Sequence, residues 1–195
     1  MTSHTIDAKE AVSVPLALRL PPELWISILR RLDYSQLKKA SRICKKIQKY
    51  VLGKEFDAVL FRQRLPEPEL RVGEALKLHP LFESASIVTE CWAGMSIHVS
   101  QDKKDHHPSE YPLTLDEFAT SPASSQITLY LPFGSSDPVS REDGVKVVDV
   151  LKLVSEYWEE NDYDDLGDHC FFEGWSHVRS EGQGHTVSVA CSFGS

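Results

Sequence analysis

Apolar residues recur at helical spacing near the start of the chain. The stripe consists of Leu24, Trp25, Ile28, Leu29 and Leu32. Because side chains three and four positions apart share one helix face, this spacing predicts an amphipathic helix. Pro21 and Pro22 suit its first turn, where a missing N–H costs no hydrogen bond.

A second stripe follows at the same kind of spacing and predicts one continuous helix. Its apolar face consists of Leu37, Ala40, Cys44, Ile47 and Val51, and its opposite face of Lys38, Arg42, Lys45 and Lys49. Ser35 is the predicted N-cap, since a hydroxyl can accept from the first free backbone N–H groups. Gly53 ends this helix, and a further short helix is predicted over residues 55–64.

The pattern changes after the prolines at 66 and 68. The predicted elements are a short helix over 70–82, strands over 87–92 and 96–100, a polar loop over 101–112, a strand over 127–131, a helix after Gly144, an acidic loop over 161–168, a strand over 170–175 and a strand over 186–193. The helix after Gly144 has the buried stripe Val147, Leu151, Val154 and Trp158. Alternating polar and apolar positions are typical of half-buried strands.

These elements predict an α+β fold with a helical first part. We expect a disordered tail over 1–14, a three-helix module over 15–65, a helical linker over 66–84 and a mixed domain over 85–195. That last domain should hold a small antiparallel sheet and one long amphipathic helix. Three short amphipathic helices cannot bury all of their apolar surface among themselves, so another surface must cover the rest.

Charge divides the chain into two parts. The net charge is −8, which argues against nucleic acid or an anionic membrane as the main partner. Residues 15–65 hold 12 Lys and Arg against 4 Asp and Glu, whereas residues 66–195 hold 8 against 23. The four cysteines form no close pair, and residues 1–14 carry no signal-peptide pattern. We therefore expect a cytoplasmic or nuclear protein, without a membrane span.

The order of residues in the first part resembles the F-box family. The resemblance rests on Leu20-Pro21-Pro22-Glu23-Leu24, Ile28-Leu29, Leu32-Asp33, Leu37, Ser41-Arg42-Ile43-Cys44-Lys45 and Glu55-Phe56. It covers about residues 16–60. Ile47 stands where an aromatic residue is common in the family, and Trp25 stands where an aliphatic one is common.

The resemblance implies a function. F-box segments bind the Skp-type adaptor of a cullin–RING ubiquitin ligase, and the rest of the chain holds a protein substrate without catalysing a reaction. The implied adaptor-binding residues are Leu20, Pro21, Leu24, Ile28, Leu29, Leu32, Leu37, Ile43, Cys44 and Lys45. Some of them belong to the module's own core, and the sequence does not sort them. No cofactor is implied.

Two other binding functions compete with this interpretation. The basic residues of the second stripe would suit a helix-turn-helix protein, but only Gln36 and Gln48 are available there to read base edges. Asp162, Asp164 and Glu173 occupy positions one, three and twelve of a calcium loop, with Leu166 where an oxygen ligand is expected. The alternative function is thus an acidic ion-binding or enzymatic domain on which the first helices pack.

The remaining candidates are weaker. A zinc cluster would draw on His169, Cys170, His177, His185 and Cys191, whose spacing lacks the close cysteine pairs of structural zinc sites. No nucleophile elbow, phosphate loop or dinucleotide fingerprint occurs. Trp175, next to Gly174, is the candidate for an exposed substrate-binding aromatic residue.

Overall fold

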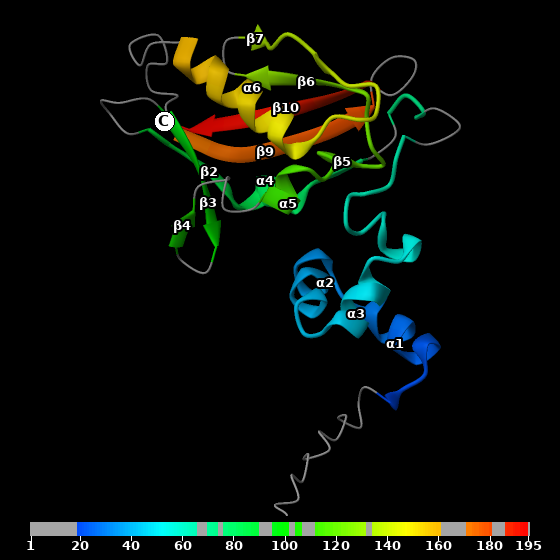
Figure 1. Ribbon diagram of the computed structural model, residues 1–195. Coiled ribbons are helices and arrows are strands. Elements are labelled where there is room, and N and C mark those ends of the chain that lie inside the picture. Colours follow the sequence, from blue (N-terminus) through cyan, green and yellow to red (C-terminus); the bar gives the residue numbers. More distant parts are fainter. Residues whose placement is uncertain are drawn as a thin grey trace, which may run out of the picture. The chain divides into compact units, whose positions relative to one another are not determined.

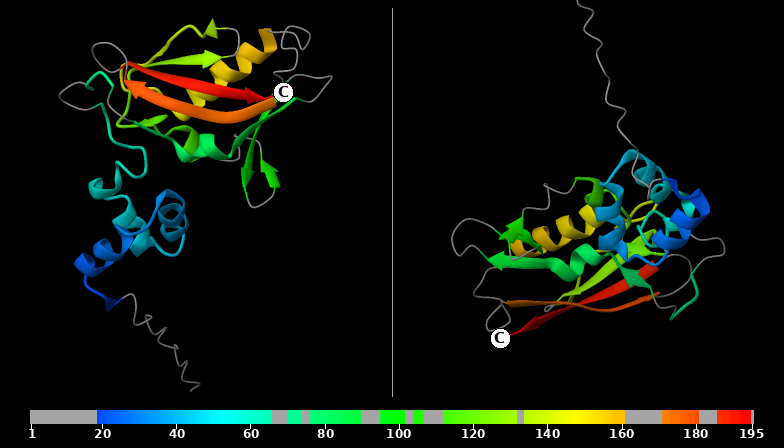
Figure 2. Two further views of the ribbon diagram at one scale, coloured as in Figure 1. Left: turned by 180° about the vertical axis from the view of Figure 1, so that it is seen from behind. Right: turned by 90° about the horizontal axis from the view of Figure 1, so that it is seen from below.

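The computed structural model divides the chain into two compact units. They are Met1–Gly53, here the N-terminal unit, and Lys54–Ser195, here the C-terminal unit. The residues that the structure describes are 19–65, 70–73, 76–89, 95–101, 104–106, 112–131, 134–160, 171–180 and 186–194. Figures 1 and 2 show the elements of each unit.

The N-terminal unit contains the helices α1 (Pro22–Leu29), α2 (Tyr34–Ser41) and α3 (Lys45–Val51). The first predicted helix is confirmed, and Pro22 is its first residue. The buried residues of these helices are Leu29, Leu37, Ala40, Ile47 and Val51. Both α1 and α2 contact α3. The apolar positions predicted from spacing thus form the core of a small helical unit.

The second predicted helix is wrong in one respect, because it is broken in the middle. The backbone of Cys44 is extended, with φ −162° and ψ 161°, and α3 begins only after it. The N–H groups of Arg42 and Ile43 donate to the carbonyls of Lys39 and Ala40 in a tight turn. The apolar spacing continues across this break, which is why the sequence pattern does not reveal it.

The start of α2 also differs from the prediction. Asp33, and not Ser35, is the N-cap. Its carboxylate accepts from the Gln36 N–H, while the Gln36 side chain accepts from the Asp33 N–H. Two orphan donors at the helix start are satisfied by this reciprocal pair, whereas a cap at Ser35 would satisfy only one.

The C-terminal unit combines helices and strands. Its helical elements are the 3-10 turn η2 (Lys54–Phe56), α4 (Pro80–Ser84), α5 (Pro112–Leu115) and α6 (Val147–Glu160). Its strands are β1 (Lys77–Leu78), β2 (Ala85–Thr89), β3 (Met95–Gln101), β4 (Lys104–His106), β5 (Thr120–Ser121), β6 (Gln126–Leu131), β7 (Gly134–Ser135), β8 (Val139–Ser140), β9 (Phe171–Ser180) and β10 (Thr186–Gly194). The predicted α+β fold class is confirmed.

Several element predictions for this unit need correction. The helix expected over 55–64 is only the short η2 followed by turns. The helix expected over 70–82 is replaced by β1 and α4, and the loop expected over 101–112 contains β4. The strand expected over 170–175 continues through Gly174 as the longer β9. The strands predicted at 87–92, 96–100, 127–131 and 186–193 correspond to β2, β3, β6 and β10.

The strands that the structure describes form three sheets, and Figure 1 shows their arrangement in the C-terminal unit. The largest has the order β7-β6-β10-β9, with β8 also paired to β6. β10 runs parallel to β6 and antiparallel to β9, so this sheet is mixed, whereas the sheets β2-β3-β4 and β1-β5 are antiparallel. A parallel pair requires a crossover, and α6 lies in the connection between β6 and β10.

The core of the C-terminal unit lies between α6 and the largest sheet, on one face of which α6 packs (Figure 2). The core residues of these elements are Ile127, Leu129, Leu131, Val147, Val150, Leu151, Val154, Val187 and Val189. The predicted stripe of α6 is confirmed at its first three positions, and the side chain of Trp158 lies outside the described residues.

The described residues of the segment predicted as a helical linker over 66–84 contribute to this core. Leu70, Leu76, Leu81 and Phe82 are all buried in the same cluster as the sheet and α6. Residues 54–65, expected in the helical module, also bond within the C-terminal unit, since the Phe118 N–H donates to the Phe61 carbonyl. The boundary between the two compact units therefore lies between Gly53 and Lys54.

Candidate functional site

Large apolar side chains are exposed on the N-terminal unit. Leu24 and Ile28 of α1 are 51% and 46% exposed, and Ile43, in the turn between α2 and α3, is 74% exposed. Leu52, directly after α3, is exposed as well. Leu24 and Ile28 are four residues apart on α1 and so share one helix face, and adjacent exposed apolar side chains are typical of protein interaction sites.

The ten residues predicted to bind the adaptor separate by burial. The exposed ones are Pro21, Leu24, Ile28, Ile43 and Lys45, and the half-buried ones are Leu20, Leu32 and Cys44. Leu29 and Leu37 are only 2% and 0% exposed, so their side chains pack inside the unit instead of on its surface. Ile28 is therefore available for binding a partner, whereas the adjacent Leu29 stabilises the core of the unit.

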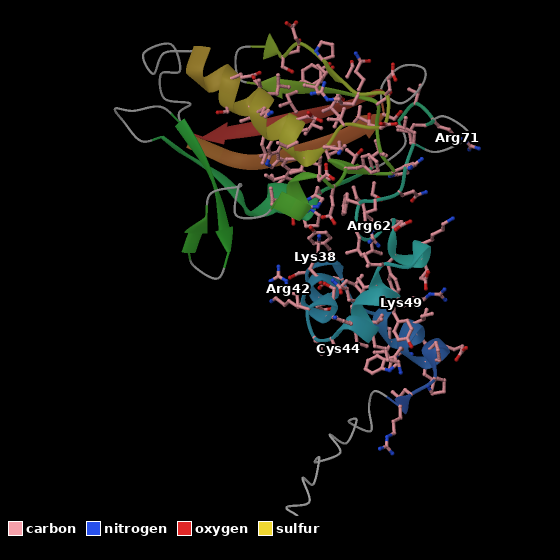
Figure 3. All side chains as sticks on the ribbon, in the orientation of Figure 1. Lys38, Arg42, Cys44, Lys49, Arg62 and Arg71 are labelled. Carbon is pink, nitrogen blue, oxygen red and sulfur yellow. The ribbon has the colours of Figure 1, made fainter. Side chains whose placement is uncertain are left out.

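Positive charge is concentrated on the same unit. No Asp or Glu occurs between Tyr34 and Gly53, a stretch that holds Lys38, Lys39, Arg42, Lys45, Lys46 and Lys49. Lys38 lies over the Tyr34 ring, with its Nζ 5.4 Å from the ring centroid. Figure 3 shows Lys38 and Arg42 at the α2 part of the unit and Lys49 on α3. Because the helix is broken before Lys45, these cations do not form one uninterrupted helical stripe.

Comparison with known families agrees with this geometry. Residues 17–58 match the family model of the F-box domain. This part of the chain is an F-box domain. The chain matched no curated protein and no solved structure. An F-box domain implies a role in a cullin–RING ubiquitin ligase through binding of the Skp-type adaptor, and F-box proteins are typically non-catalytic adaptors.

The F-box match extends slightly past the N-terminal compact unit. It includes η2, and within η2 the Phe56 side chain is 1% exposed. Glu55 and Phe56 are two of the positions at which the sequence resembles the F-box family, and the Phe56 side chain is a buried core residue. The predicted boundaries of the F-box resemblance, about 16–60, agree with the match to within two residues at either end.

The competing ion-binding hypothesis falls mostly outside the described residues. Asp162 and Asp164 lie there, and so do His169, Cys170 and His185 of the zinc hypothesis. The side chains of Glu173, His177 and Cys191 are not described either, although their backbones belong to β9 and β10. Among the residues that are described, no three His, Cys, Asp or Glu side chains come together as a metal site. No described helix is long and apolar enough to span a membrane.

Trp175 occupies a different position from the one expected of it. It is half-buried and packs against the core of the C-terminal unit, with its ring centroid 4.9 Å from that of Phe82. Trp175 is therefore less exposed than an aromatic residue that stands free on the surface. A contact of Trp175 with a substrate stays a prediction.

The C-terminal unit contains a buried polar pair that no sequence pattern predicts. His79 is fully buried, and its Nε2 lies 3.3 Å from the carboxylate of Glu117, which is also buried. The Leu81 N–H donates to His79 Nδ1, so Nε2 carries the proton and donates to the carboxylate. The rings of Phe61 and Phe82 pack edge-on against the imidazole. The partners lie 38 positions apart in the sequence, so no local pattern reveals this pair.

Proposed function

We propose that this chain is the substrate-recognition subunit of a cullin–RING ubiquitin ligase, acting in the cytoplasm or nucleus. Its F-box domain binds the Skp-type adaptor, and its C-terminal unit holds a protein substrate. The observation that carries the proposal is the exposure of Leu24, Ile28 and Ile43 within the F-box match. By holding the substrate near the ligase, the chain raises the effective concentration of the substrate there. This role needs no catalytic residue in the chain itself.

Burial of these side chains supplies the affinity. Full burial of one aliphatic side chain contributes about 1.5–3 kcal/mol. Leu24 and Ile28 are about half exposed and Ile43 is 74% exposed, so a partner can still bury much of their surface. A few such anchors dominate most protein interfaces. The lysines and arginines of the same unit favour an acidic partner and raise the association rate at low ionic strength.

Co-expression with a Skp-type adaptor, followed by size-exclusion chromatography, tests the adaptor half of the proposal. We expect a stable complex with the natural chain and none with the double variant Leu24→Asp and Ile28→Asp. Both side chains are exposed, so the variant should keep its fold, which circular dichroism checks. Val72→Asp is the matched control, because Val72 is an exposed apolar residue outside the F-box match. Absence of a complex with the natural chain would overturn the proposal.

The substrate half rests on the C-terminal unit. Residues 66–195 hold 8 Lys and Arg against 23 Asp and Glu, so this part favours a partner with basic groups. Proximity labelling in cells, with the ligase inhibited, compares the natural chain with a chain truncated after residue 58. Proteins labelled by the natural chain and not by the truncated one are the expected substrates. Identical labelling by the two chains would contradict this half.

A further inference from the structure

A charged pocket lies in the C-terminal unit, just after the F-box match. Its volume is about 300 Å³. Six charged residues line it, namely Arg62, Arg64, Asp116, Glu117, Asp143 and Lys146. Three are basic and three acidic, so the described lining residues carry no net formal charge. A pocket of this size and polarity is suited to a small polar group or to a few side chains of a peptide.

The walls of the pocket are held by the main chain. The Phe118 N–H donates to the Phe61 carbonyl at 2.8 Å, and the Val147 N–H donates to the Glu117 carbonyl at 3.0 Å. Phe61 and Phe118 also line the pocket. Phe61 has a φ of 52°, an uncommon backbone conformation for a residue with a side chain. The pocket is therefore built by three separate segments that are bonded to one another.

Four of the six charges already have partners. Arg62 pairs with Asp57 at 3.2 Å, Lys146 pairs with Asp116, and Glu117 accepts from His79. Among the described residues, Arg64 and Asp143 form no hydrogen bond or ion pair, either with each other or with a third group. Both side chains are exposed. Within the part of the chain that the structure describes, the pocket thus offers one cation and one anion without a partner, Arg64 and Asp143.

We infer that this pocket binds a short peptide segment of the substrate that carries one basic and one acidic side chain. The guanidinium of Arg64 would pair with the peptide's carboxylate and Asp143 with its ammonium or guanidinium group. A ligand of a single charge is disfavoured, since it would leave one of the two groups facing a like charge. The inference deepens the proposed function, because it rests on the C-terminal unit being the part that holds the substrate.

The test uses the full chain and four capped glycine-rich pentapeptides, titrated by NMR. Two of them carry lysine and glutamate at the second and fourth positions, in either order, and the others carry two lysines or two glutamates. We expect the natural chain to bind at least one mixed peptide about tenfold more tightly than the like-charged peptides, as expected for one charge-assisted contact. The shifted resonances should include those of Arg64 and Asp143.

Two charge reversals sharpen the test. Asp143→Lys should bind the two-glutamate peptide best, and Arg64→Glu the two-lysine peptide, because each variant presents two like charges. A variant that misfolds would lose all binding, whereas a switch of preference requires an intact pocket. Equal affinity of the natural chain for all four peptides, no binding, or reversals without a switch would each overturn the inference.

Adaptor binding separates this inference from the proposed function. Arg64 and Asp143 both lie outside the F-box match at residues 17–58, so both reversals should still form the adaptor complex. If the peptides fail while the adaptor complex forms, the pocket inference falls and the adaptor-binding proposal stands. If the natural chain binds the mixed peptide and not the adaptor, the adaptor-binding proposal falls and the pocket remains.

Discussion

Asp33 and Gln36 close the start of α2 by two reciprocal hydrogen bonds. The Gln36 N–H donates to Asp33 Oδ1 at 2.8 Å, and the Asp33 N–H donates to Gln36 Oε1 at 3.1 Å. The N-terminal unit is small and its free energy of unfolding is limited, so the contribution of one helix cap is a substantial fraction of it. The same pair fixes the turn by which the chain enters α2 after α1.

Loss of this cap should weaken the F-box domain measurably. Asp33→Ala is expected to lower the free energy of unfolding by about 1 kcal/mol, because the N–H of Gln36 loses its acceptor. Ser35→Ala is the control, since the cap does not use Ser35, and it should change the stability by less than about 0.5 kcal/mol. Urea unfolding followed by circular dichroism measures both. A larger loss for Ser35→Ala would contradict the assignment of the cap.

Neighbouring residues of α1 should separate folding from binding. Leu29→Ala is expected to cost about 2–5 kcal/mol of stability, because it leaves a cavity in the core. Ile28→Ala should cost less than about 1 kcal/mol, since Ile28 is 46% exposed, yet it should weaken adaptor binding. Thermal unfolding and isothermal titration calorimetry with the adaptor separate the two effects. The prediction fails if Ile28→Ala destabilises the fold as much as Leu29→Ala does.

Local patterns predicted much of this fold from sequence. The helix α6 and the strands β6 and β10 were predictable, because each buries residues at the period of its own structure, as Val147, Val150 and Val154 do in α6. The F-box was predictable because its residues follow one another in order. Ser35 was the wrong N-cap because Asp33 is an equally good capping residue, and only Gln36 decides between them.

Other features depend on contacts between distant segments. The break at Cys44 keeps the spacing of Leu37, Ala40 and Ile47, so periodicity does not detect it. The pocket charges Arg64 and Asp143 lie far apart in sequence and line the same pocket because the main chain of residues 117 and 118 bonds to both of their segments. The structure shows which F-box residues are buried in the core and which are exposed on the surface. The order of these residues in the sequence does not distinguish the two groups.

A buried carboxylate stabilises the start of α6. Asp149 accepts from the Lys146 N–H at 3.1 Å and pairs with Arg141 at 2.7 Å. Asp149→Ala should cost about 1–3 kcal/mol, because the partly buried N–H of Lys146 loses its acceptor. Arg141→Ala should cost less than about 1 kcal/mol, since the arginine side chain is 56% exposed and its pair is partly solvated. Chemical unfolding of the two variants measures the difference, and equal losses would contradict this ranking.

Gly144 occupies a position where a side chain would collide. Its φ is +112°, and a Cβ placed there would lie 2.9 Å from the ring of Phe118. Gly144→Ala should therefore destabilise the C-terminal unit by more than about 1–2 kcal/mol, the usual cost of the backbone conformation alone. Gly134→Ala is the control, because Gly134 has a φ of +138° with nothing within 4 Å. Thermal unfolding compares the two variants. Equal unfolding temperatures would show that the collision with Phe118 adds nothing to the loss of stability.

The buried pair of His79 and Glu117 should depend on the acceptor more than on the charge. Glu117→Leu is expected to cost about 1–3 kcal/mol, because the Nε2–H of His79 would be buried without its carboxylate. Glu117→Gln should cost less, since an amide oxygen can accept the same hydrogen bond. Asp116→Asn is the surface control, as its carboxylate is 75% exposed and pairs with Lys146 only at the surface. Urea unfolding of the full chain compares the three variants. If the glutamine variant is as unstable as the leucine variant, the negative charge of Glu117 and not its hydrogen bond holds the pair.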